Sequence, residues 1–281
     1  MKESIAQLLV HVDATPRSGE RLEVARDIAQ SHGAAITALY AVTPALMVVP
    51  FAPEAGTSVG ATLREIDDER RVAARAALDR SLAAPGVHAA WAEVQDYPIV
   101  PAFSRQALFA DLLVLGQQDP SQGSPGVPFD FVESVIAASG KAALVLPYAA
   151  LPPVVGETIV IAWKPTREAA RAVSAAVPML QRARHVHVVS WTDEAQEESI
   201  AGARLDLDGY LRLRGIEPVW HRERGGEPEY LGELLLSRAF DLGADLLVMG
   251  CYGHSRAREW VLGGTSRTVL RSMTLPVLMA H

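Results

Sequence analysis

Two glycine pairs enclose a short segment near the C-terminus, and their spacing is suited to binding an anion. Two residues separate Gly250 from Gly253, and nine separate Gly253 from Gly263, which Gly264 follows directly. Glycine lets a backbone approach a phosphate closely and direct several N–H groups at it. The segment follows an apolar run and precedes a predicted helix, whose first N–H groups would add further donors. The pattern therefore predicts a phosphate-binding loop.

Residues on both sides of this loop could complete the site. Thr265 and Ser266 begin the predicted helix and could supply a hydroxyl, and Lys164 follows another strand and could pair with an anion. Ala162, near the end of that strand, and His254, within the loop, are the remaining candidate binding residues. Two simpler interpretations stay open: the glycines could form a tight turn with nothing bound, and Lys164 could be a solvated side chain.

The sequence predicts neither a catalytic group nor a metal site. His254 and Ser255 are neighbours in the chain, so they cannot easily face each other as base and nucleophile. His185 and His187 would share one face of a strand, but a third ligand is not evident. Cys251 is the single cysteine, which excludes a disulfide framework. It could be a buried apolar residue or a redox-sensitive thiol.

The loop belongs to the second of two related halves. The run Asp111–Gly116 recurs as Asp245–Gly250. Apolar runs at the start and end of each half also match in order, at 8–12 and 159–163 and at 143–146 and 276–279. Prolines between 147 and 153 indicate a short linker. The predicted domains are therefore residues 1–150 and 155–281.

Strand and helix patterns alternate in both halves, and their order repeats. The predicted strands are 7–12, 35–42, 87–94, 111–116 and 142–147, then 158–163, 185–191, 216–221, 245–250 and 275–280. The predicted helices are 18–31, 62–83, 98–109 and 130–138, then 167–182, 195–214, 228–242 and 265–273. Short apolar strands between helices are typical of a parallel sheet covered on both faces. The predicted fold class is α/β, with two tandem doubly wound domains, each a five-stranded parallel sheet flanked by helices.

Local signals support these elements. Gly33 follows the first helix as a C-cap, and Thr166 precedes a later helix as an N-cap. The apolar segment 43–61 has no counterpart in the second half and is predicted to be a surface insertion, with a lid or partner-contact role as the alternative.

Composition excludes several classes of protein. The chain has 281 residues, of which 33 are acidic and 26 basic, so its net charge of −7 argues against non-specific binding of nucleic acid. No apolar run approaches the roughly 20 residues that cross a bilayer, and no signal peptide is recognisable at the start. We therefore expect a cytoplasmic protein.

The glycine spacing resembles the Gly-x2-Gly-x9-Gly-Ser/Thr signature of the universal stress protein family. The strand 8–12 followed by Asp13, the helix 267–271 and the final strand 276–279 are also similar to that family. The resemblance covers both halves and implies an adenine-nucleotide-binding fold, often dimeric and linked to stress survival, which binds ATP in some members. It therefore implies ATP or AMP as the cofactor, with or without Mg²⁺.

Departures from that signature assign the nucleotide to the second half. Gly264 stands where the family has Ser or Thr, and Lys164 stands where the first half keeps Asp13. In the first half, the positions that match Gly253, Gly263 and Gly264 hold Asp119, Phe129 and Asp130, in that order. The two carboxylates would repel a phosphate, and the phenylalanine would block a close backbone approach. The resemblance therefore predicts one nucleotide per chain.

The predicted function is that of a stress-response protein that binds ATP or AMP and acts as a non-catalytic sensor or regulator, slow hydrolysis being left open. The alternative is a tandem interaction module that binds a protein partner without a ligand. The resemblance also implies that the halves pair through their final strands as an internal pseudo-dimer, and a homodimer of chains is a further expectation. An adenine-nucleotide hydrolase is disfavoured, because no Ser-Gly-Gly-x-Asp-Ser loop follows either first strand.

Overall fold

The computed structural model describes residues 3–48, 57–81, 86–149, 151–191, 203, 205–223, 230–251 and 264–281. The chain forms two compact units: one comprises Ser4–Tyr148, and the other comprises Ala149–His281 together with Glu3. The predicted pairing between the halves stays a prediction. Among the described helices, none is long and apolar enough to cross a membrane.

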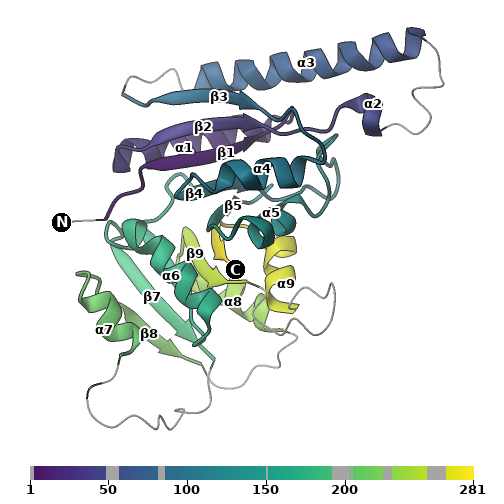
Figure 1. The fold of residues 1–281 in the computed structure, drawn as a ribbon. Coiled ribbons are helices and arrows are strands. Elements are labelled where there is room, and N and C mark those ends of the chain that lie inside the picture. Colours follow the sequence, from purple (N-terminus) through teal and green to yellow (C-terminus); the bar gives the residue numbers. More distant parts are fainter. Residues whose placement is uncertain are drawn as a thin grey trace. The chain divides into compact units, whose positions relative to one another are not determined.

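The first unit is a five-stranded parallel sheet in the order β3-β2-β1-β4-β5 (Figure 1). Helix α1 packs against α3, and α4 packs against α5. The strands are β1 (Gln7–Val12), β2 (Ala35–Tyr40), β3 (Ala89–Glu93), β4 (Leu112–Gly116) and β5 (Ala143–Leu146). The helices are α1 (Arg17–His32), α2 (Ala45–Val48), α3 (Thr57–Ser81), α4 (Ile99–Ala107) and α5 (Phe131–Ser139).

The second unit repeats this strand order, as β8-β7-β6-β9-β10, and its strands are also parallel. Its strands are β6 (Thr158–Ala162), β7 (His185–Ser190), β8 (Val219–Arg222), β9 (Leu246–Gly250) and β10 (Val277–Ala280). Its helices are α6 (Arg167–Leu180), α7 (Leu207–Arg212), α8 (Leu231–Asp241) and α9 (Gly264–Ser272). The predicted fold class is confirmed, because both units are doubly wound sheets of the same order.

The aspartate that opens the repeated run has the same structural role in both units. Asp111 accepts hydrogen bonds from the backbone N–H groups of Ala6 and Gln7, at 2.8 and 3.0 Å. Asp245 likewise accepts three backbone N–H groups, those of Gly156, Glu157 and Thr158, at 2.6 to 3.0 Å. Each carboxylate therefore ties the start of the unit's first strand to the start of its fourth.

The predicted caps are confirmed, and the first helix carries an apolar stripe. Gly33 ends α1 with a φ of 72°, a left-handed conformation that favours glycine, and its N–H bonds the carbonyl of Ala29. The Thr166 hydroxyl accepts a hydrogen bond from the Ala169 N–H at the start of α6. The stripe faces the core, since its members are all at most 5% exposed: Leu22, Ala25, Ile28 and Ala29.

The largest differences from the predicted elements lie in two segments. The insertion 43–61 contains helix α2 and the first turn of α3, so the predicted helix 62–83 begins earlier, at Thr57. Asp67 on α3 accepts hydrogen bonds from the Ala45 N–H, at 3.1 and 2.9 Å, which fixes α2 against α3. The predicted helix 195–214 is described only as α7, because much of its N-terminal part lies outside the described residues.

Candidate functional site

The predicted phosphate-binding loop lies mostly outside the described residues. Gly253, His254 and Gly263 fall within residues 252–263, of which nothing is described. Its two ends are described: Gly250 is the last residue of β9, and Gly264 is the first residue of α9.

The described candidates gather at the carboxyl ends of β6 and β9. These strands are neighbours, and Ala162 pairs with Met249, next to Gly250. Lys164 is exposed just beyond β6, and its carbonyl accepts a 2.7 Å hydrogen bond from the Thr166 N–H. The order of the strands reverses here, which is where doubly wound sheets bind ligands.

The first turn of α9 carries the two hydroxyl candidates. Ser266 is buried and 5% exposed, whereas Thr265 is half-buried. Both lie in the turn whose backbone N–H groups have no partner within their own helix, so this turn is a source of donors at the C-terminal end of the loop.

Gly250 has a packing role that does not depend on a ligand. A Cβ atom at this position would overlap the backbone of Glu168 and Ala169 in the first turn of α6. Glu168 is itself buried, and the hydrogen bond from Arg167 lowers its pKa. The tight approach of β9 to α6 therefore explains this glycine, while Gly253 and Gly263 stay assigned by their spacing alone.

Cys251 is a packing residue at the end of β9. It is 1% exposed, and its N–H bonds the Ala280 carbonyl at 2.9 Å. Burial, followed by the charge of Glu168, raises the pKa of its thiol to about 12. The thiol is therefore protonated at neutral pH, which favours the apolar interpretation over thiolate chemistry.

His187 contacts a second histidine on the neighbouring strand. Its Nδ1 atom lies 3.0 Å from His221 Nε2, and Arg238 contacts His221 Nδ1 at 3.1 Å. Within the described part of the chain, no group of three or more potential ligands is arranged to hold a metal.

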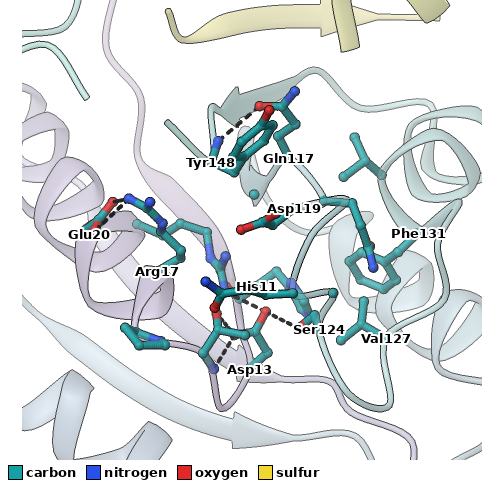
Figure 2. A pocket seen from close by; sticks show the side chains of 18 residues that line it. His11, Asp13, Arg17, Glu20, Gln117, Asp119, Ser124, Val127, Phe131 and Tyr148 are labelled. Carbon is teal, nitrogen blue, oxygen red and sulfur yellow. Dashed lines mark hydrogen bonds and ion pairs between the residues drawn. The ribbon is translucent and has the colours of Figure 1, made fainter. Parts of the chain in front are cut away.

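The first unit contains a cavity of about 360 Å³ at the carboxyl ends of β1 and β4 (Figure 2). Strand register makes this place equivalent to the predicted site of the second unit. Leu8 pairs with Leu112 in one unit, and Ile159 pairs with Leu246 in the other. Three residues along each first strand, His11 therefore corresponds to Ala162, and two residues further on Asp13 corresponds to Lys164.

Asp13 lies at the base of this cavity, and both of its carboxylate oxygens are occupied by the protein. Oδ1 accepts from the Thr15 N–H at 2.8 Å, the Thr15 hydroxyl at 2.5 Å and the Ser18 hydroxyl at 2.9 Å. Oδ2 accepts from the Ser124 hydroxyl and pairs with the Arg21 guanidinium, both at 2.9 Å. Both side chains of the ion pair are about 5% exposed.

These contacts decide the protonation states at the base of the cavity. Burial alone would raise the pKa of Asp13, but Arg21 and the hydrogen bonds hold it well below its ordinary value. Burial lowers the pKa of His11 to about 4, so this imidazole is neutral at neutral pH. His11 Nε2 lies 3.0 Å from the Ala41 carbonyl, so in the neutral ring Nε2 carries the hydrogen and Nδ1 is an acceptor.

The rim of the cavity carries a second ion pair and an acid. Arg17 donates to both oxygens of Glu20, at 2.9 and 2.7 Å, and both side chains are about 40% exposed. Asp119 accepts from the N–H and hydroxyl of Ser121, and these hydrogen bonds lower its pKa. Figure 2 shows its side chain reaching into the cavity.

The position of Phe129 in the first unit does not fit the blocking role expected of it. Phe129 was expected to block the approach of a ligand, yet it is 71% exposed and does not line the cavity. Asp130 is also exposed and accepts from the Ser134 hydroxyl at 2.9 Å at the start of α5. Of the three substituted positions, Asp119 alone lines the cavity.

Two residues at the base of the cavity, Arg21 and His11, were not predicted from the sequence. A signal was available for the first, because Ser18, Arg21, Leu22 and Ala25 form one helical stripe, which places an arginine on a buried face. A buried arginine needs a carboxylate, and Asp13 precedes the same helix. For His11 the signal was weaker, since an imidazole within an apolar strand is compatible with simple packing.

Comparison with known proteins identifies a family for the second unit. Residues 156–281 match the Universal stress protein family. A universal stress protein of Synechocystis sp. is 53% identical over 38 residues, which are 14% of this chain and 13% of that protein. The chain therefore spans only a small part of the length of this curated relative.

Solved structures of similar fold extend over both units. A universal stress protein from Archaeoglobus fulgidus aligns with a TM-score of 0.70 at 17% identity, covering 98% of this chain and 97% of that one. A protein of unknown function from Pseudomonas aeruginosa aligns with a TM-score of 0.61 at 16% identity, covering 98% and 92%. At such identities these similarities establish the fold of both halves.

Proposed function

The chain carries a universal stress protein domain in residues 156–281, and from this premise we propose that it is a stress-response protein that binds an adenine nucleotide through that domain. ATP or AMP is the proposed ligand, and the domain acts as a sensor or regulator without catalysing a reaction on it.

One observation carries this proposal: the family match covers the half of the chain that holds the complete glycine spacing. The described ends of that loop are consistent with it, because Gly250 ends a strand that pairs with β6 and Gly264 begins a helix. In the first unit, by contrast, the Asp13 carboxylate is taken up by protein partners.

Calorimetric titration of the full chain with ATP tests the proposal. We expect one nucleotide per chain, and mass spectrometry of the nucleotide released from purified protein should identify ATP or AMP. Two equivalent ATP sites per chain, or none, would contradict the assignment.

The variant Gly253→Asp places a carboxylate where the phosphates are proposed to lie. ATP affinity should fall at least tenfold, about 1.4 kcal/mol, while the melting temperature without ligand stays unchanged. Gly60→Asp on α3 adds the same charge in the first unit and is the matched control. Equal ATP affinity in the two variants would refute the role of the loop.

A further inference from the structure

The cavity of the first unit is large enough for a small molecule. Its volume of about 360 Å³ falls in the range of small-molecule sites, and it opens at the position where this fold binds ligands. The charge and polarity of its lining residues determine which class of ligand it can bind.

Both arginines in the described lining of the cavity already pair with a carboxylate. Arg21 is committed to the Asp13 carboxylate, the His11 carbonyl at 3.0 Å and the Ser18 hydroxyl at 2.7 Å. Arg17 donates to both oxygens of Glu20. The described lining contains three acidic and two basic side chains, so its net charge is negative. The side chain of Asp119 points into the cavity.

An uncharged ring finds complementary surfaces. Val127, which is half-buried, lines the cavity together with the buried side chains of Phe131 and Val132, so part of its wall is apolar. The side-chain amides of Gln118 and Gln122 can each donate and accept, and amides of this kind match the edge of a heterocycle that carries both types of group.

The base of the cavity adds a further acceptor. The neutral imidazole of His11, which is 3% exposed, has its Nδ1 left to accept, because Nε2 bonds Ala41. The buried ion pair next to it stays intact without a ligand, since both Asp13 oxygens have protein partners.

We propose that this cavity is a second ligand site, which takes an uncharged polar heterocycle of nucleoside size and rejects its phosphorylated forms. The proposal does not depend on nucleotide binding by the second unit. The two units would then recognise ligands that differ in charge.

Adenosine, AMP and ATP form a probe series for this site, because they differ mainly in phosphate charge. Hydrogen exchange of the full chain, read by mass spectrometry, reports the two units separately. Adenosine should slow exchange in peptides from residues 116–132, whereas ATP at the same concentration should not. Absence of adenosine protection in these peptides up to millimolar concentration, or equal protection by ATP, would overturn the proposal.

A variant that is expected to gain binding tests the site in a way that unfolding of the variant could not imitate. Asp119→Lys reverses the excess charge in the cavity, so AMP should then protect residues 116–132 and bind there at least tenfold more tightly than in the wild type. Asp79→Lys makes the same change of charge at an exposed position on α3 outside the cavity lining and should leave AMP binding unchanged. Equal responses in the two variants would show that the cavity does not select by charge.

The variant Val127→Trp fills the cavity from its apolar side. It should abolish adenosine protection of residues 116–132 and leave any ATP response of residues 156–281 as it was. Loss of the ATP response in Gly253→Asp with adenosine protection retained would support both sites. Absence of adenosine protection in the wild type, with its ATP response present, would overturn this proposal alone.

Discussion

The two units have the same strand order, but the residue that follows the first strand differs between them in charge and in burial. In the first unit that position is Asp13, buried and paired with Arg21 from the following helix. In the second it is Lys164, which is exposed. A duplicated scaffold can therefore hold a buried, paired charge at this position in one copy and an exposed charge in the other, without changing its strands.

The glycines that end β4 and β9 show the same divergence. A Cβ atom on Gly116 would overlap the end of the Arg21 side chain, whereas one on Gly250 would overlap the backbone of Glu168 and Ala169. In the first unit the Arg21 side chain occupies the space next to the end of β4. In the second unit the backbone of α6 lies in contact with the end of β9. The helix start in the second unit is thereby brought directly against the strand end.

The largest expected effect follows from breaking the buried ion pair. Arg21→Met leaves Asp13 buried without its counter-ion, which typically costs about 3–5 kcal/mol. Lys164→Met, at the equivalent place in the second unit's strand-to-helix connection, should change stability by less than about 0.5 kcal/mol. Hydrogen exchange of peptides from β1 and β4, compared with β6 and β9, measures the two costs in their own units.

A double variant separates charge from packing. Asp13→Asn combined with Arg21→Met removes both charges and should cost less than Arg21→Met alone. If Arg21→Met were no more harmful than Lys164→Met, the ion pair would have no part in holding the first unit together.

His11 gives the first unit a pH dependence that Ala162 cannot give the second. The unfolded imidazole binds a proton near pH 6.5, and the folded one only near pH 4. Between these values the unfolded state holds more protons, so stability falls as the pH drops through this window. At about 1.4 kcal/mol per unit of pKa, the loss is about 3 kcal/mol.

Urea denaturation at several pH values between 7 and 4 tests this contribution. His11→Gln should flatten the pH dependence relative to the wild type. His185→Gln, at an exposed position, should leave the slope unchanged. Parallel curves for the wild type and His11→Gln would mean that the buried ring does not resist protonation.

The smallest expected difference concerns the two strand-end glycines. Gly250→Ala must displace helix backbone and should cost about 2–3 kcal/mol, as overpacking does. Gly116→Ala has to displace the guanidinium of Arg21, which is buried and paired with Asp13, and should cost a similar amount. Melting temperatures of the two variants provide the measurement, and a cost below about 0.5 kcal/mol at Gly116 would mean that Arg21 can move without loss of its ion pair.

The fold could be predicted because its signals are local or repeated. Apolar runs, the Gly33 and Thr166 caps and the recurrence of Asp111–Gly116 as Asp245–Gly250 define strands and helices without knowledge of tertiary contacts. The start of α3 was predicted too late because residues 57–61 contain glycine and β-branched side chains, whose helix propensity is low. Its packing against α2, through Asp67, could not be foreseen.

The site was harder to predict because its charges are settled by distant residues. Ser124 and Asp13 are 111 positions apart, and their hydrogen bond depends on the closed sheet. Asp119, which was identified as a barrier to phosphate, lines the cavity, whereas Phe129, to which a blocking role was assigned, is exposed and does not line it. Spacing alone does not tell which way a loop side chain points.

The two equivalent aspartates that precede β4 and β9 affect the order in which each half can fold during its synthesis. Asp111 reaches back across 105 residues to Ala6, and Asp245 across 89 residues to Gly156. The first strand of each half therefore leaves the ribosome long before the residue that holds its beginning in place. Until that aspartate emerges, nothing from the fourth strand opposes a one-residue slip, which would turn the apolar side chains to the wrong face. The aspartate that helps to fix the register of each sheet is thus translated late within its half. The first half has received its aspartate before the second half is synthesised.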